Sequence, residues 1–241
     1  TPQVVALEGD RAPGKHGGDL RILMSKDRDA RFVGAYGYAR LVCWTPAGEL
    51  VPDIAISVDV DEADKTFTFK LRKGHRWSDG KVFTSEDFRF FWEDMAGDKT
   101  LGRFFSSTNL LVEGEQPKVE FPDAQTVRYT WAKPNPNFLP WLAGPSNLTI
   151  FRPAHVYKKF HEKYATKERL AKLNEKRKDG WVRKIATEDR NARNNLNPNM
   201  PTLDPWIAKT EGVAERYEFS RNPFYHRIDV NGRQLPYADR V

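Results

Sequence analysis

The sequence is poor in the residues that build disulfides, metal clusters and membrane spans. Of its 241 residues only Cys43 is a cysteine, which excludes an intrachain disulfide and a cysteine-based metal cluster. No apolar run approaches the length that crosses a bilayer. Residues 1–3 lack the basic start of a signal peptide, so the chain is either cytosolic or exported with its leader already removed.

Enzyme motifs are missing as well. The five histidines form no H-E-x-x-H pair, and no P-loop, G-x-G-x-x-G fingerprint or G-x-S-x-G elbow is present. Pairs of acids occur at 59/61, 86/87 and 93/94, but closeness along a chain does not make a general acid and base. The sequence therefore predicts no catalytic residue, no metal site and no cofactor.

Positive charge exceeds negative charge by six, with 39 Lys and Arg against 33 Asp and Glu. Lys and Arg are most concentrated in residues 158–193. Because Asp and Glu are interleaved with them there, this segment is better explained as a solvated helical face than as a binding site for a polyanion. No motif of RNA or DNA binding is found, so we expect no nucleic-acid partner.

Aromatic residues are plentiful, with 15 Phe, 8 Tyr and 7 Trp, although the mean hydropathy is -0.70. This combination predicts a soluble globular protein with a real hydrophobic core. A cleft lined by aromatic rings would suit peptide side chains, sugar faces or a bulky apolar ligand.

The most specific local pattern is a strand followed by a tight turn. Phe67, Phe69 and Leu71 alternate with polar neighbours, which predicts a strand over residues 66–71 with one buried face. The sequence W-S-D-G at 77–80 then predicts a turn, because glycine supplies the positive φ that a tight turn needs.

A helix start follows this turn. Thr84 fits the N-cap position and Asp87 the third position of a capping box. Apolar residues then recur at helical spacing and mark one helix face: Phe88, Phe91, Trp92 and Met95. We assign the conspicuous residues of this motif to folding rather than to ligand binding: Trp77, Asp79, Gly80, Thr84 and Asp87.

The same patterns predict the remaining elements. Strands are expected over residues 19–24, 57–60, 110–121, 126–131, 148–150 and 217–221, with 57–60 and 66–71 forming a hairpin. Helices are expected over 84–97, over 138–142 and from about residue 154 to about residue 187. Loops are expected over 25–35 and 191–201.

Three stretches resemble one protein family. They are LRKGHRWSDGKVFTSEDF at 71–88, LVCWTPAGELVPDIA at 41–55, and a tail in which RNPFY at 221–225 precedes DVNGRQLPYADRV at 229–241. In this order they are similar to the family 5 extracytoplasmic solute-binding proteins, which are the peptide, dipeptide and nickel receptors of ABC importers.

The resemblance implies a mixed α/β fold like one lobe of a type II periplasmic binding protein. A small α/β domain, residues 46–144, would be inserted into a base domain made of residues 1–45 and 145–241. Family members are considerably longer, so we expect an N-terminal lobe with the second lobe missing. Such a half-receptor offers one wall of the cleft and should bind ligand weakly or not at all.

The implied function is capture of a peptide or similar small solute for uptake by a non-enzymatic, monomeric, periplasmic protein whose signal peptide is removed. An oligosaccharide, a metal chelate or an opine-like molecule are alternative ligands, and the permease subunits of an ABC importer are the implied membrane partners. Regions that face the cleft in relatives imply these ligand-binding residues: Ser25, Asp27, Arg28, Phe104, Phe105 and Trp206.

Two readings from other classes stay open. A secreted hydrolase acting on glycans would need two carboxylates facing each other across a cleft at the required spacing. A basic scaffold that docks a partner through residues 158–193 would show steeply salt-dependent binding.

Overall fold

The computed structural model describes residues 2–5, 12–35, 37–105, 108–145 and 150–241, and these residues form ten short strands and several helices. The strands are β1 (Gln3–Val4), β2 (Val42–Trp44), β3 (Leu50–Pro52), β4 (Ala55–Val60), β5 (Thr66–Leu71), β6 (Lys118–Asp123), β7 (Thr126–Thr130), β8 (Trp206–Ala208), β9 (Phe219–Arg221) and β10 (Arg227–Ile228). The α-helices are α1 (Ser85–Arg89), α2 (Phe138–Leu142), α3 (Ala154–Tyr157), α4 (Lys167–Asn174) and α5 (Gly180–Arg193). The 3-10 helices η1 (Asp27–Ala35) and η3 (Thr108–Leu110) and the π-helix η2 (Phe90–Ala96), which continues α1, complete the set.

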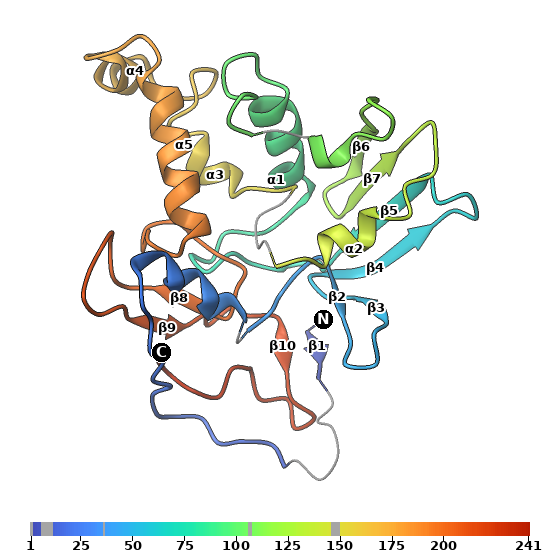
Figure 1. Cartoon of the computed structure of the whole chain (residues 1–241), viewed down its shortest axis with the longest axis vertical. Helices are drawn as coiled ribbons and strands as arrows, with labels where there is room; N and C mark the ends of the chain where they lie inside the picture. Colours follow the sequence, from blue (N-terminus) through green and yellow to red (C-terminus); the bar gives the residue numbers. More distant parts are fainter. Residues whose placement is uncertain (1, 6–11, 36, 106–107, 146–149) are drawn as a thin grey trace.

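A four-stranded antiparallel sheet in the order β4-β5-β7-β6 is the largest sheet. The predicted hairpin of β4 and β5 is confirmed, and β5 pairs with β7 so that Phe67 faces Tyr129 and Phe69 faces Val127. Three two-stranded sheets, β2-β3, β8-β9 and the parallel pair β1-β10, lie outside it, while α4 and α5 rise at the opposite side of the molecule (Figure 1). The mixed α/β class is confirmed.

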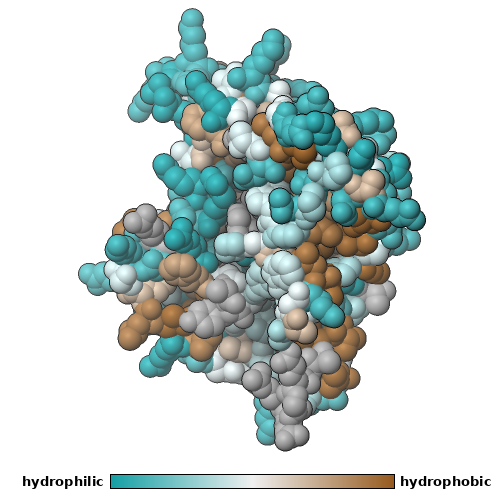
Figure 2. Space-filling view, turned by 45° about the vertical axis from the view of Figure 1, so that its right-hand side comes forward, coloured by the Kyte–Doolittle hydropathy of each residue, from teal (hydrophilic) through white to brown (hydrophobic). Residues whose placement is uncertain are grey.

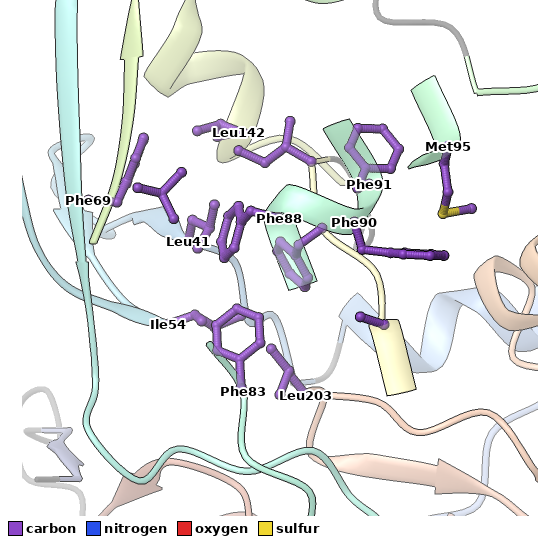
Figure 3. Packing of buried hydrophobic residues seen from close by; sticks show 14 of the residues in the cluster. Leu41, Ile54, Phe69, Phe83, Phe88, Phe90, Phe91, Met95, Leu142 and Leu203 are labelled. Carbon is purple, nitrogen blue, oxygen red and sulfur yellow. The ribbon is translucent and has the colours of Figure 1, made fainter. Parts of the chain in front are cut away.

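The main hydrophobic core lies between the sheet and the helices. The rings of β5 pack edge-on against Phe138 of α2, with the centroid of Phe67 5.1 Å and that of Phe69 5.9 Å from it, and the Tyr129 ring of β7 lies tilted against it at 5.3 Å. Figure 3 shows Phe88, Phe90 and Phe91 entering the same space from α1 and η2. A separate smaller cluster consists of five buried residues: Ala30, Val33, Leu196, Trp206 and Phe219.

The large cluster draws residues from both predicted domains, including Leu41 and Tyr157 on one side and Phe69 and Phe88 on the other. The division into residues 1–45 with 145–241 and residues 46–144 stays a prediction. Within the described residues, no helix combines the length and the apolar composition that crossing a bilayer requires.

Asp87 is the polar centre of the strand–turn–helix motif. It forms the predicted capping box with Thr84, whose backbone N–H donates to Oδ2 at 3.0 Å. The indole Nε1 of Trp77 donates to the same oxygen at 3.3 Å, and the backbone N–H of Ala154 donates to Oδ1 at 2.9 Å. Burial raises the pKa of Asp87 to about 7, although these three donors oppose that rise.

Several sequence predictions fail in an informative way. Residues 19–24 form no strand, because among them only Asp19 has a bridge partner, Arg240. Residues 27–35 of the loop predicted over 25–35 form helix η1 instead. The Asp29 carboxylate caps its start, accepting hydrogen bonds from the backbone N–H groups of Ser25 at 3.2 Å and Lys26 at 3.1 Å.

Element boundaries also shift. The strand predicted over 110–121 begins only at Lys118, the strand predicted over 217–221 begins at Phe219, and the loop predicted from 191 begins after Arg193. The single helix predicted over 154–187 is divided into α3, α4 and α5, with Thr166 capping the start of α4. The predicted strand at 148–150 lies largely outside the described residues.

A second buried polar cluster surrounds Asp53. Its carboxylate accepts hydrogen bonds from His226 Nε2 at 2.8 Å and Arg227 Nε at 2.9 Å. The ring of His75 lies 5.2 Å from that of His226, and both nitrogens of His75 are buried without a hydrogen-bond partner among the described residues. Burial, together with the nearby His226 and Arg72, lowers the pKa of His75 to about 3.

We expect Asp87→Asn to lower the free energy of unfolding by about 2–3 kcal/mol, because an amide offers one acceptor oxygen to three buried donors. Chemical denaturation at about pH 4 measures the loss, because this pH lies below the raised pKa of Asp87 and the buried carboxyl carries no ionisation cost there that the amide would relieve. Asp59→Asn is the matched control, since Asp59 lies exposed on β4, and its change should stay within about 0.5 kcal/mol. Equal effects of the two substitutions would contradict the role given to Asp87.

We expect His75→Phe to stabilise the fold by about 1–3 kcal/mol at neutral pH, because it removes two buried ring nitrogens without partners. The folded-state pKa of His75 lies below the unfolded value of about 6.5, so the wild type loses stability as the pH falls below about 6.5. The variant lacks this loss. The difference in free energy of unfolding between His75→Phe and the wild type should therefore grow by about 1.4 kcal/mol per pH unit as the pH falls to about 5.

Denaturant titrations of the wild type and of His75→Phe across this pH range measure the difference in their free energies of unfolding. A difference that stays constant with pH would contradict a buried neutral His75.

Candidate functional site

Two grooves flank helix η1 and share the ring of Phe32. The first, here termed the aromatic–arginine groove, has a volume of about 840 Å³ and runs between η1, β2 and the end of α5. The second, the edge cleft, has a volume of about 760 Å³ and lies between residues 19–25 and residues 216–219. Volumes of this size suit a small solute.

Helix η1 is held in place by hydrogen bonds at its start and by buried side chains beneath it. At its start the Asp29 carboxylate accepts hydrogen bonds from Ser25, including one from Oγ at 2.9 Å, which lowers the pKa of Asp29. Beneath it, Ala30 and Val33 belong to the small buried cluster that contains Trp206 of β8. The opposite face of η1 is left for the grooves.

Three aromatic rings line the aromatic–arginine groove. Phe32 is 53% exposed and Trp44 is 45% exposed, and both lie on the wall of this one groove. Tyr38 is partly buried, and its hydroxyl donates a short hydrogen bond to the carbonyl of Ala143. The rings therefore offer flat apolar faces with one polar contact already used by the fold.

Arg40 forms the floor of this groove and is fully engaged. Its guanidinium donates to the carbonyls of Gly144 at 3.1 Å and Pro145 at 2.6 Å and lies 5.1 Å from the centroid of the Tyr38 ring. It also lies 3.7 Å from Asp204. Arg40 thus ties segment 143–145 to η1 and β2 and fixes the groove's shape.

The rim of the groove carries cations that are available to a ligand. Arg31 and Arg190 are exposed, and among the described residues neither forms an ion pair. Arg31 stacks on Phe32 at 5.1 Å. A cationic rim above apolar rings suits a ligand that carries both a carboxylate and an apolar group.

Arg193 connects the groove to the core. Its Nε lies 2.9 Å from Oδ2 of Asp189, and Asp189 is buried against the Arg152 guanidinium. Arg152 in turn lies over the Phe91 ring at 4.8 Å and the Phe105 ring at 5.9 Å. The position of α5, and with it the groove's far wall, thus depends on a buried ion pair.

The sequence-predicted ligand residues fall into separate environments. Ser25 lines the edge cleft, Asp27 is exposed on η1, and Arg28 belongs to the same helix. Phe104 is exposed and stacked under Arg103 at 4.9 Å, and it lines neither groove. Their role in ligand binding stays a prediction.

Phe105 and Trp206 are core residues in this structure, each about 5% exposed or less. Phe105 supports Arg152, and Trp206 supports η1. Any effect of these two side chains on a ligand would pass through the positions of α5 and η1, and their direct contact with ligand stays a prediction.

The sequence analysis named none of the groove residues as ligand-binding: it expected residues 25–35 to be a loop and selected Ser25, Asp27 and Arg28 from it. Aromatic residues at 32, 38 and 44 recur every six positions, with Arg31 and Arg40 beside two of them. This recurrence is a signal that could have suggested one lined surface. Nothing local marks Arg190 and Arg193, which reach the site through the fold of α5.

Two of the three carboxylate pairs noted in the sequence, 86/87 and 93/94, are engaged by the fold. Asp87 caps α1, while Asp94 accepts from Tyr164 at 2.7 Å and Lys163 at 3.0 Å. Glu86 and Glu93 pair with Arg89. In the part of the chain that the structure describes, no group of three or more His, Cys, Asp or Glu is placed to hold a metal ion.

Comparison with known families identifies the class of protein. The family model of bacterial extracellular solute-binding proteins, family 5 Middle, matches residues 49–241. Because this match covers most of the chain, the protein belongs to that family.

Individual relatives agree with this assignment. The periplasmic alpha-galactoside-binding protein of Rhizobium meliloti (strain 1021) is 28% identical over 193 residues, which are 80% of this chain and 25% of the relative. The periplasmic oligopeptide-binding protein OppA of Escherichia coli (strain K12) is 31% identical over 129 residues, which are 48% of this chain and 23% of OppA.

A solved structure of an oligopeptide-binding protein OppA superimposes on all of this chain with a TM-score of 0.80 and 31% identity. The superposition covers 36% of that OppA chain. The chain thus spans about a quarter of the length of the curated relatives and about a third of the solved one. Each of these relatives is named as a binding protein.

We expect Trp206→Ala to loosen η1 and to lower the free energy of unfolding by about 3–5 kcal/mol, because it empties the small cluster under the helix. Trp206→Phe should cost about 1 kcal/mol or less, since it keeps the ring and removes an indole N–H that is buried without a partner among the described residues. Chemical denaturation combined with hydrogen exchange over residues 27–35 measures both effects. Unchanged exchange in Trp206→Ala would contradict this support of η1.

Proposed function

We propose that this chain forms part of the solute-binding component of an ABC importer and captures a peptide or similar small solute in the aromatic–arginine groove. The observation that carries the proposal is the pairing of exposed rings, Phe32 and Trp44, with rim arginines that form no ion pair among the described residues. Membership of the solute-binding family 5 supports the same function.

The groove can contact two chemical groups of such a ligand at the same time, a carboxylate and an apolar side chain. The guanidinium groups of Arg31 and Arg190 can donate paired hydrogen bonds to a carboxylate, which is their preferred planar partner. An apolar side chain can lie against the faces of Phe32 and Trp44. A free peptide carries both groups a few ångströms apart.

The rim charge favours a peptide over a neutral sugar. Aromatic faces serve sugars as well as side chains, and one relative is named for alpha-galactosides, so an oligosaccharide is the competing ligand. A neutral oligosaccharide would leave Arg31 and Arg190 without a counter-charge in the bound state. The match to OppA proteins, named for oligopeptides, agrees with the peptide.

The wider setting follows from the same proposal. The protein would act outside the cytoplasm as a monomer without catalytic activity and would deliver its ligand to the permease subunits of an importer. The relatives named as periplasmic support the location. A base domain of residues 1–45 and 145–241 with residues 46–144 inserted would form one wall of the cleft, and a second lobe would close over the ligand.

The tripeptide Ala-Phe-Ala tests the proposal against its C-terminal amide and against the neutral sugar stachyose. Calorimetric titration at high ligand concentration should show binding of the free acid, and the amide should bind about tenfold more weakly or worse. Arg31→Gln with Arg190→Gln should reduce the affinity for the free acid to that of the amide, because both changes remove the same contact.

Lys73→Gln with Lys81→Gln is the matched control, since it removes the same charge from exposed positions outside the groove. That control should bind the free acid as the wild type does. Equal binding of acid and amide by the wild type, or tighter binding of stachyose, would contradict the peptide proposal.

A further inference from the structure

Nearly all of the protein's net charge is concentrated in one segment. Residues 158–184, here termed the basic tip, run from the end of α3 through α4 into α5. They contain eleven Lys and Arg against four Asp and Glu, a net charge of +7 when the whole chain carries +6. The rest of the molecule is therefore close to neutral.

Six cations of the basic tip are exposed and form no ion pair among the described residues, and one of them, Arg169, lies over the Phe160 ring at 5.7 Å. The tip's other five Lys and Arg form ion pairs, such as Lys158 with Glu86 and Lys184 with Glu188. The remaining six form no ion pair within the described part of the chain: Lys159, Lys167, Arg169, Lys172, Lys176 and Lys178. Five of these six are lysines, which present hydrated point charges rather than a preorganised hydrogen-bonding fork.

The basic tip lies at one end of the molecule. Figure 1 shows α4 at the extreme of the long axis, and Figure 2 shows that end covered with projecting hydrophilic side chains. Leu170 and Leu173 of α4 pack against the main core, which turns the charged side of this helix outward. The charge is thus placed where a flat partner could reach it without meeting the rest of the protein.

The composition of the tip favours a charged surface over a protein partner. Protein interfaces are organised around buried aromatic or aliphatic anchors. The exposed large apolar side chains of this protein, such as Phe32, Trp44 and Leu23, all lie outside residues 158–184. A partner of the tip must therefore bind by charge alone.

We propose that the basic tip adsorbs to anionic lipid headgroups at a bilayer surface. Lysines beside such a surface add roughly equal increments of attraction, screened over about 10 Å at moderate salt. The contact needs no apolar insertion, and the two grooves beside η1 do not take part in it. This inference stands independently of the ligand of the aromatic–arginine groove.

Co-sedimentation with lipid vesicles tests the proposal. Vesicles with about 30% phosphatidylglycerol in phosphatidylcholine should retain the protein at about 50 mM salt, pure phosphatidylcholine should not, and about 500 mM salt should release it. The variant Lys172→Gln with Lys176→Gln and Lys178→Gln should lower the partition coefficient at least tenfold, because each lysine contributes about fivefold.

The matched control removes three exposed lysines elsewhere, by Lys73→Gln with Lys81→Gln and Lys209→Gln, and should bind as the wild type does. Equal losses in the two variants would overturn the proposal, because attraction would then follow net charge and not the tip. The proposal would also be overturned if the wild-type protein did not bind anionic vesicles, or if it bound soluble polyglutamate more tightly than lipid of equal charge.

Discussion

The carboxylate of Asp87 is the interaction on which much of this structure depends. It accepts hydrogen bonds from the N-cap residue Thr84, from the Trp77 indole and from the backbone of Ala154, so one side chain joins a turn, a helix start and a segment 67 residues away. Its own carbonyl accepts from the backbone N–H of Arg152 at 3.1 Å. The WSDG turn and the aromatic helix are thereby fixed to the entry of α3.

From Asp87 the chain of contacts leads to the candidate site. Arg152, held by its backbone, pairs with Asp189 of α5, and Asp189 positions Arg193 at the groove. Phe91 and Phe105 flank the Arg152 guanidinium and keep water from this pair. The strand–turn–helix motif around Asp87, which the sequence analysis assigned to folding alone, therefore also determines the position of α5 at the groove.

The sequence predicted the parts of the fold that local chemistry controls. The hairpin of β4 and β5, the capping box at Thr84 and the short helix α2 depend on alternation, caps and turns, which neighbouring residues reveal. Helix η1 was missed because its start depends on Asp29 reaching back to Ser25, in a stretch too polar to show helical periodicity. The strand predicted at 19–24 failed because alternation signals a possible pairing but cannot supply the partner.

The groove could be predicted less well than the fold. Its residues come from η1, β2 and α5, about 150 positions apart in the chain, and only tertiary packing brings them together. Family resemblance directed attention to Ser25, Phe104 and Trp206, of which one lines the edge cleft, one lines neither groove and one is buried under η1.

Hydrogen–deuterium exchange with and without Ala-Phe-Ala tests most directly which surface of this chain receives the ligand. If the aromatic–arginine groove is that surface, protection should appear over residues 31–35, 37–44 and 190–194 and should leave residues 20–25 and 216–219 unchanged. Protection confined to those last two segments would place the ligand in the edge cleft and contradict the account.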